Sequence, residues 1–368
     1  MTGAVPTVDL VVAGNEASDL LAVRAPEVLS AYGARRAFWT VLDEAPIDRA
    51  LALLVQEESG RWAAYPVAAD AGVEQGRTED GEALARFGEW VYVFGSHFGS
   101  KAGPLRPRRA FVARFRESDA AVGLLRLQVV RNQFRLHRAV NDVLAGAEIT
   151  TLAPGDRVRH RFIAETVARG TARAKTWVSR LAPDDLPLNV EGAAFTPSGN
   201  LLLGLRFPVT DRGEPILIEL SGLVGMFESG GWPHAVRALA LTGVTPAGAL
   251  TGFRALSAQS DGSYAAVIGS IDALGKGSVL LDDHPSGGDV TSRHVRFQLP
   301  AEPHATAVPA ELVADLAPLH NVEGLAEVDE GHLYVTDEDQ RIALWSGLSS
   351  DRDVRAAPPR INGRETSW

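Results

Sequence analysis

The chain of 368 residues contains no cysteine. This absence excludes disulfide bonds, thiolate metal sites and cysteine nucleophiles. No apolar run approaches the roughly 18 residues that a membrane-spanning helix needs. The amino end, residues 1–12, has no basic segment, and Asp9 interrupts its apolar stretch. We therefore expect a cytoplasmic protein with no membrane partner.

Several sequence signatures of catalysis are also missing. The chain has no Gly-x-Gly-x-x-Gly, no Gly-x-x-x-x-Gly-Lys-Ser/Thr, no His-Glu-x-x-His and no Gly-x-Ser-x-Gly. Nucleotide binding and α/β-hydrolase chemistry are therefore disfavoured. We expect no nucleotide cofactor.

The charge is distributed unevenly along the chain. The formal net charge is −10, yet residues 101–180 contain 17 of the 36 Lys and Arg and only six acids, a local balance of +11. Such asymmetry favours a surface that faces an anionic ligand or the acidic part of the same protein, and a solvated basic face is the plainer interpretation. The acidity of the whole chain and the shortage of aromatics in this segment argue against nucleic-acid binding.

An internal repeat is the most informative feature that is present. The pattern D/N-x-E-G/A-L/A-A, followed about ten residues later by a short apolar strand, occurs three times, and a fourth copy has Arg in place of Glu. The copies are Asp80–Ala85 before 90–94, Asn189–Ala194 before 201–205, Asn321–Ala326 before 333–335, and Arg254–Ser257 before 264–268. Repeats of short strands separated by Gly, Pro, Asp and Ser predict an all-β fold, a β-propeller.

The spacing of the copies bears on the number of blades. Five units are recognisable, and Glu82 to Glu191 spans 109 residues where the other intervals span 63 and 69. An additional blade in the long interval gives six, which is our prediction. The alternative is five blades plus a partly helical basic insert at about 131–185, where the spacing of the apolar residues is helical, at Phe134, Ala139, Val140, Val143 and Leu144.

The two ends of the chain are predicted to close the ring. The sequence predicts a strand at Val8–Val12 that belongs to none of the five units, and the last unit lacks an outer strand. We expect a single propeller domain over residues 1–348 and a loose tail over 349–368.

Three stretches carry a resemblance to a known family. They are 82–98, with Glu-Ala-Leu-Ala and Val-Phe-Gly-Ser-His-Phe; 188–208, with Leu-Asn-Val-Glu-Gly-Ala-Ala-Phe-Thr-Pro-Ser-Gly-Asn; and 321–338, with Asn-Val-Glu-Gly-Leu-Ala and Tyr-Val-Thr-Asp-Glu. The chain resembles a bacterial domain-of-unknown-function family of predicted β-propellers. It is more distantly similar to phytase-like esterase propellers and to calcium-dependent gluconolactonase-type propellers. The resemblance supports the fold and adds little to function.

The repeated glutamates are the first candidate site. Inner strands of a propeller line its central channel, so Glu82, Glu191 and Glu323 are predicted to meet there. Three carboxylates in a small space need a cation, an Arg or raised pKa values, and Arg254 is a natural partner. With Asp337 they form an oxygen-only metal site suited to Ca²⁺ or Mg²⁺. The competing interpretation is that these glutamates only clamp neighbouring blades together.

The ends of the apolar strands are the second candidate site. They carry polar residues at matched positions, and we expect them to surround one rim of the channel. His97 is a candidate proton-transfer residue because its ordinary pKa of about 6.5 lies near working pH. Ser96, Lys101, Arg206 and Arg254 are candidate substrate-binding residues for a carbonyl or anionic group. Other rim residues are Asp43, Glu44, Asp272, Asp337 and Glu338.

These observations predict a small-molecule enzyme at the channel mouth. The expected reaction is hydrolysis of an ester, lactone or phosphoester, or a related addition-elimination, on a small polar or anionic molecule. Glu82, Glu191 and Glu323 would act as general bases or hold the cation, and Arg206 and Arg254 would neutralise developing charge. The alternative is a non-catalytic scaffold that binds a ligand or a protein, with the basic segment 101–180 as its docking face.

Overall fold

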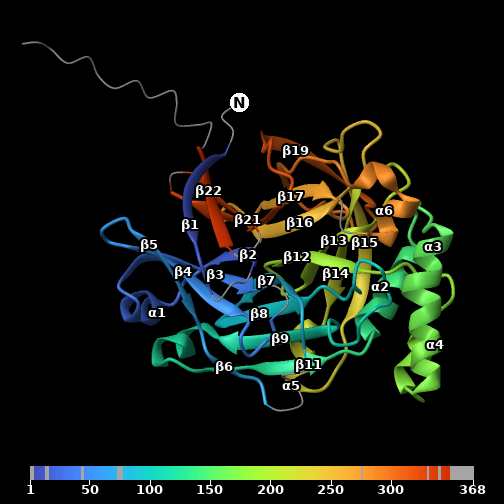
Figure 1. Cartoon of the computed structure of the whole chain (residues 1–368), viewed down its shortest axis with the longest axis horizontal. Helices are drawn as coiled ribbons and strands as arrows, with labels where there is room; N and C mark the ends of the chain where they lie inside the picture. The colour runs from blue at the N-terminus through green and yellow to red at the C-terminus, as the bar shows by residue number, and fades with distance from the viewer. Residues whose placement is uncertain are drawn as a thin grey trace, which may run out of the picture.

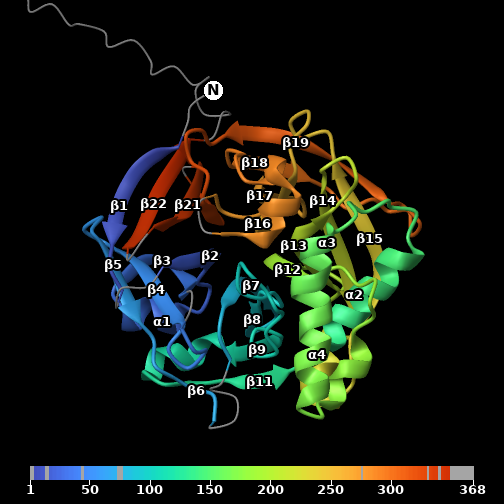
Figure 2. The same ribbon diagram turned by 45° about the vertical axis from the view of Figure 1, so that its right-hand side comes forward.

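The computed structural model describes residues 4–12, 16–42, 45–72, 78–274, 277–329, 331–338 and 341–348. Its main strands pair into five antiparallel four-stranded sheets arranged around a centre (Figure 1 and Figure 2). Three of these sheets stand alone, and parallel pairing of two outer strands, β15 and β19, joins the other two into an eight-stranded sheet.

Each sheet is a run of strands in which chain neighbours pair with one another. We number the sheets along the chain and give the strands of each from the inner to the outer one. The first sheet is β2 (Ala17–Ala22), β3 (Ala34–Leu42), β4 (Leu51–Glu57) and β5 (Trp62–Pro66), and the second is β7 (Gly81–Phe87), β8 (Trp90–Gly95), β9 (Phe111–Arg116) and β11 (Gln128–Arg131). The third is β12 (Asn189–Phe195), β13 (Leu201–Val209), β14 (Pro215–Ser221) and β15 (His234–Thr242); the fourth is β16 (Thr251–Ala258), β17 (Tyr264–Ser270), β18 (Arg293–Phe297) and β19 (Ala307–Asp315); and the fifth is β20 (Val322–Val328), β21 (Gly331–Glu338), β22 (Arg341–Leu348) and β1 (Val5–Leu10). A short parallel pair, β6 (Ala69–Asp70) and β10 (Leu125–Arg126), lies beside the first two sheets.

The inner strands form a closed circle. Each of β2, β7, β12, β16 and β20 contacts the inner strand of both neighbouring sheets. Five clusters of buried apolar side chains fill the five spaces between adjacent sheets. The fold is therefore a β-propeller whose core consists of sheet-to-sheet interfaces around a central channel.

The number of sheets corrects our preferred blade count. The described residues contain no sixth four-stranded sheet, and the long interval between the second and third sheets is largely helical. Its elements are α2 (Arg135–Gly146), α3 (Asp156–Val158), the π-helix η3 (Arg159–Ala164), α4 (Glu165–Ala172) and the 3-10 helix η4 (Thr176–Arg180). Leu136, Val140 and Leu144 fall on one face of α2 and are buried in the cluster between the second and third sheets. Val143 also packs against this cluster, and because it is three residues from Val140 the two would point to opposite faces of a strand, so this spacing requires a helix.

The other helices are short and connect strands. They are α1 (Pro26–Ala31), η2 (Glu117–Val122), α5 (Leu223–Glu228), α6 (Val279–Asp283) and η5 (Pro285–Gly287). Among the described residues no helix is long and apolar enough to cross a membrane. The tail predicted over residues 349–368 lies outside the described residues.

Closure of the ring by the first strand is confirmed. β1 pairs antiparallel with β22 and supplies the outer strand of the fifth sheet, with Val8 opposite Leu344 and Leu10 opposite Ile342. Figure 1 shows the blue β1 beside the red β22. The strand covers Val5–Leu10 rather than the predicted Val8–Val12.

The closure gives a testable prediction about β1. Leu10 is 8% exposed and belongs to the cluster between the fifth and first sheets, whereas Val5 on the same strand is 58% exposed. Leu10→Ala is expected to lower the free energy of unfolding by about 2 kcal/mol. Val5→Ala is expected to change it by less than about 0.5 kcal/mol. Equal effects in urea unfolding would show that β1 does not dock as described.

Candidate functional site

The repeated residues reach the channel because each inner strand bulges there. The strand register shifts between Gly81 and Ala83, between Val190 and Gly192, between Phe253 and Ala255, and between Val322 and Gly324. The residue between each pair is left out of the ladder, and these residues are Glu82, Glu191, Arg254 and Glu323. A bulge redirects the side chain of the extra residue, which explains why four sheets present a charged group at the same level.

Two glycines allow the inner strands to approach closely after the bulge. A Cβ on Gly192 would lie 2.7 Å from Cβ of Leu256, and one on Gly324 would lie 2.7 Å from the backbone carbonyl carbon of Asp19. Both partners are on the next inner strand. Glycine is therefore required at these two positions of the repeat by the narrow circle of strands.

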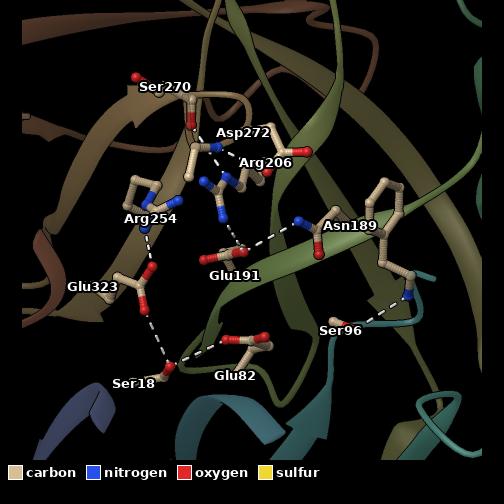
Figure 3. A network of polar contacts seen from close by, with 12 residues as sticks. Ser18, Glu82, Ser96, Asn189, Glu191, Arg206, Arg254, Ser270, Asp272 and Glu323 are labelled. Carbon is tan, nitrogen blue, oxygen red and sulfur yellow. Dashed lines mark hydrogen bonds and ion pairs between the residues drawn. The ribbon is translucent and has the colours of Figure 1, made fainter. Parts of the chain in front are cut away.

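The three glutamates meet as the repeat predicts. One carboxylate oxygen from each of Glu82, Glu191 and Glu323 lies within 4.8 Å of the other two, although the residues belong to three different sheets. Glu191 and Glu323 are buried, and Glu82 is partly buried. Figure 3 shows the three carboxylates facing one another. We call this arrangement the glutamate cluster.

Hydrogen bonds from neighbouring sheets hold the glutamate cluster in place. Ser18 Oγ lies between two glutamates, 3.1 Å from Oε2 of Glu82 and 3.3 Å from Oε2 of Glu323, and its single proton is available to either. Arg254 Nη2 donates to Glu323. On the third sheet, Glu191 accepts from Arg206 Nη1 at 3.0 Å and from Asn189 Nδ2 at 3.1 Å. The network joins all five sheets (Figure 3).

The glutamate cluster lies in a cavity of about 660 Å³ at one end of the inner strands. Eight acidic side chains and five Lys or Arg side chains line it, so the cavity is polar with an excess of negative charge. The charged lining residues are Glu16, Asp80, Glu82, Glu191, Asp272, Asp289, Glu323, Asp337, Lys101, Arg106, Arg109, Arg206 and Arg254. A volume of this size is typical of a site for a small molecule.

The two arginines of the network respond differently to burial. Burial, the largest cause, and the nearby Arg206 lower the pKa of Arg254 to about 10. Burial also opposes the charge of Arg206, yet Glu191 and Asp272 outweigh it, and the pKa of Arg206 is raised. Both guanidiniums therefore remain charged at neutral pH and compensate two of the three carboxylates.

Some polar atoms of the network have no partner. Arg254 Nε and Nη1 and Asn189 Oδ1 are buried without a hydrogen bond to any described residue. Buried donors and acceptors are normally satisfied, so each such atom calls for an explanation. A ligand hydroxyl or carbonyl could accept from Arg254, and a ligand hydroxyl could donate to Asn189.

Asp80 is a further cavity residue with altered acidity. Its carboxylate accepts from Arg109 Nη1 at 2.7 Å and from the Ser96 hydroxyl. Burial is the largest cause of its shift, and the pKa of Asp80 is raised despite Arg109 and Ser96, with Glu191 contributing in the same direction. Asp80 can therefore hold a proton more readily than an exposed carboxylate.

His97 is not placed where our sequence interpretation put it. It does not line the cavity, is 1% exposed, and has both ring nitrogens in hydrogen bonds. Nδ1 donates to the Gly95 carbonyl and Nε2 accepts from Asn132 Nδ2, each at 2.7 Å. Burial lowers the pKa of His97 to about 4. It is a neutral residue that fixes the backbone behind the cavity, which sequence could not reveal because a strand end does not show which side its loop faces.

The remaining predicted residues divide into two groups. Arg206, Arg254, Lys101 and Asp337 line the cavity. Asp337 lies outside the glutamate cluster, however, so the described carboxylates offer three metal ligands there rather than four. Ser96 acts through Asp80 and is not itself a lining residue. Asp43 and Glu44 lie outside the described residues.

Glu338 lies outside the cavity. It accepts hydrogen bonds from Thr336 and Arg341 instead.

Two elements of the site were not predicted. Ser18 occupies the channel position in the first sheet, and Arg109 holds Asp80. The spacing Glu16-Ala17-Ser18 matches Asp80-Gly81-Glu82, and Glu16 lines the cavity as Asp80 does. That spacing is the signal that could have identified Ser18. The sequence carries no comparable signal for Arg109.

The ring of five sheets defines a β-propeller with a polar cavity at one mouth of its channel. No protein-family model and no curated protein matches the chain. Similar solved structures are propeller-type proteins. They include a thermostable family-43 glycoside hydrolase (9% identity, 95% of this chain and 97% of that chain, TM-score 0.42). A mannose phosphorylase from Leishmania mexicana (10%, 92% and 87%, 0.40) and a candidate gluconolactonase (12%, 95% and 92%, 0.38) are also similar. At these TM-scores the similarities carry no argument about activity.

The buried neutral state of His97 predicts a pH effect on stability. Its pKa is lowered to about 4 in the folded protein, and an unfolded histidine titrates near 6.5. Between these values the unfolded chain binds the proton and the folded chain does not, so stability falls as pH drops from about 6.5 to about 4. The contribution of His97 is about 3 kcal/mol. His97→Gln, which keeps a donor and an acceptor, should make the pH dependence of the unfolding free energy shallower by that amount. Parallel curves for the two proteins would contradict the assignment.

Proposed function

We propose that the chain is a small-molecule enzyme that acts at this mouth of the channel. The reaction is hydrolysis of an ester, lactone or phosphoester, or a related addition-elimination. The observation that carries the proposal is the meeting of Glu82, Glu191 and Glu323 in one cavity beside the unpartnered donors of Arg254. A cytoplasmic location and the absence of nucleic-acid partners remain part of the proposal.

The lining of the cavity favours a neutral, hydroxylated substrate. Acidic side chains outnumber Lys and Arg around the cavity, which disfavours a strongly anionic molecule. Carboxylates accept hydrogen bonds from hydroxyl groups, and the free Nε and Nη1 of Arg254 can donate to a carbonyl. A molecule with several hydroxyls and one carbonyl or ester group satisfies both kinds of atom.

The roles of the residues follow from their positions. Arg254 has two unpartnered donors, Nε and Nη1, and either can stabilise negative charge on a substrate oxygen as it develops. Because His97 lies outside the cavity, proton transfer is assigned to carboxylates: the glutamate cluster, and Asp80 with its raised pKa. Arg206 and Asn189 orient Glu191.

A divalent cation fits the glutamate cluster. Two oxygens on opposite sides of a Ca²⁺ ion lie about 4.6–5.2 Å apart, because each bond is 2.3–2.6 Å long. Oxygens within 4.8 Å of one another can therefore share one ion. Glu82, Glu191 and Glu323 would hold Ca²⁺ or Mg²⁺, and Asn189 Oδ1 is a nearby unpartnered oxygen. A bound cation would polarise a substrate carbonyl or lower the pKa of a water molecule.

A non-catalytic ligand-binding propeller is the second candidate. The observation that favours it is the pairing of Glu191 and Glu323 with arginines, the arrangement expected of a clamp between sheets. A clamp is important for stability, whereas a crowded catalytic cluster is costly for stability. The two functions therefore predict different effects of a Glu-to-Gln substitution on the free energy of unfolding.

A matched pair of variants distinguishes the enzyme from the non-catalytic ligand-binding propeller. Glu191 accepts from an Arg and an Asn, and so does Glu219, which bonds Arg237 and Asn200 on the outer part of the third sheet. Glu219 belongs to no three-carboxylate cluster among the described residues. Glu219→Gln should lower the free energy of unfolding by about 1–3 kcal/mol. Glu191→Gln in the cation-free protein should leave it unchanged or higher, because removing one carboxylate relieves repulsion.

Calcium titration by calorimetry completes this test. Ca²⁺ binding should be lost in Glu191→Gln and retained in Glu219→Gln. If the protein binds no divalent cation and both variants are destabilised equally, the glutamates are clamps and the cation assignment is wrong.

A second prediction concerns the guanidinium of Arg254. Lysine keeps the charge beside Glu323 but removes the two unpartnered guanidinium donors, so Arg254→Lys should lower kcat by about 10²–10³-fold on the substrate found in a panel of lactones, esters and phosphoesters. The control is Arg237→Lys, which alters a buried Arg–Glu pair away from the cavity. Unchanged kcat/KM in Arg254→Lys, or an equal loss in the control, would refute this role.

A further inference from the structure

A second cavity lies between the helical insert and the loop that follows β8. Its volume is about 680 Å³, and it is lined by residues 100–108 except for 101 and 102, by the end of β11, and by α4 and η4. Six of its lining side chains are cationic and none is acidic. The cations are Arg106, Arg108, Arg131, Arg169, Arg173 and Lys175. We call this cavity the basic pocket.

Most of these cations have no counter-charge. Arg169 pairs with Glu165 and Arg106 with Glu79. In the part of the chain that the structure describes, Arg108, Arg131, Arg173 and Lys175 have no carboxylate partner within 4.0 Å. Arg131 Nε is also buried without a hydrogen bond. Four uncompensated cations around one concave surface repel one another until an anion binds.

The basic pocket has a built framework. Thr166 Oγ1 accepts from Leu105 N at 3.0 Å, which fixes the loop of the second sheet against α4. A Cβ on Gly170 would lie 2.6 Å from the ring of Trp177, so α4 and η4 pack in direct contact. Ala174 adopts a left-handed conformation with φ of 48°, and the chain turns there between Arg173 and Lys175. The positions of the cations are therefore set by packing as well as by flexible side chains.

We propose that the basic pocket binds a small phosphorylated molecule with at least two negative charges, such as one that carries a diphosphate group. Guanidinium groups match phosphate oxygens with two parallel hydrogen bonds, and several of them surround the space. One carboxylate would leave most of the positive charge uncompensated. The ring of Trp177, which lines the basic pocket, offers an apolar wall for the organic part of the ligand.

The shape and the charge of the protein favour a small molecule over a nucleic acid. The volume lies in the range of small-ligand sites. The chain outside residues 101–180 carries a formal charge of −21, which repels a long polyanion that extends beyond the basic pocket. The basic pocket is distinct from the glutamate cluster, although Ser100 and Arg106 line both cavities. The inference does not rest on the proposed enzyme activity.

Titration calorimetry of the full chain with sodium pyrophosphate at low salt tests the inference. Arg108→Glu and Arg173→Glu remove exposed lining cations, and their affinity should fall by about tenfold or more. Arg159→Glu changes the charge equally on the same insert, but Arg159 does not line the basic pocket. Its affinity should change by less than about twofold. Melting temperatures of all three variants check that they are folded.

Three additional ligands make the outcomes decisive. ADP should bind in the same variant-sensitive way, and citrate should bind more weakly than pyrophosphate. Binding of pyrophosphate to Glu191→Gln should equal that of the unmodified chain, which separates this site from the glutamate cluster. No pyrophosphate binding, or an equal loss in Arg159→Glu, overturns the inference. Tighter binding of a single-stranded oligonucleotide, lost in the same variants, overturns it in favour of nucleic acid.

Discussion

Three carboxylates that meet within 4.8 Å must be compensated, and this requirement organises the centre of the molecule. The fourth sheet supplies Arg254 in place of a glutamate, and the third sheet adds Arg206 from its second strand. The first sheet contributes a neutral hydroxyl, Ser18, between two glutamates. Four of the sheets share the same bulge at the channel, but the channel residues of the five sheets are complementary rather than identical. A ring of five glutamates would be strongly self-repelling.

The same comparison explains how much of the fold could be read from sequence. The repeat identified the inner strands of four sheets, because a Gly or Ala follows each channel residue, and at Gly192 and Gly324 it is imposed by the distance between strands. Length alone could not distinguish a blade from an insert of similar size between Glu82 and Glu191. The spacing of Leu136, Val140, Val143 and Leu144 contained the answer, since these side chains share one face of a helix but not one face of a strand.

The site was predictable where the repeat or the matched ends of the apolar strands marked it. Glu82, Glu191, Glu323 and Arg254 share a register position, so their convergence followed from symmetry. His97 stands outside the repeat, and only the fold shows that its ring turns toward Asn132. Ser18 was hidden because it differs in chemistry from its counterparts. Asp80 precedes β7 and Arg109 precedes β9, and nothing in their sequence spacing indicates that the two side chains are in contact.

The pairing of β1 with β22 also constrains how the protein is made. β1 is synthesised before the other strands of the ring and pairs with β22, which is synthesised after them, so the fifth sheet cannot be completed until residues 341–348 have emerged. Until then Leu10 and the apolar residues it will cover stay accessible to solvent and to other chains. Contacts so distant in sequence form slowly because the intervening chain must be ordered first. A stalled or shortened product would therefore carry an open sheet edge that chaperones and proteases can recognise.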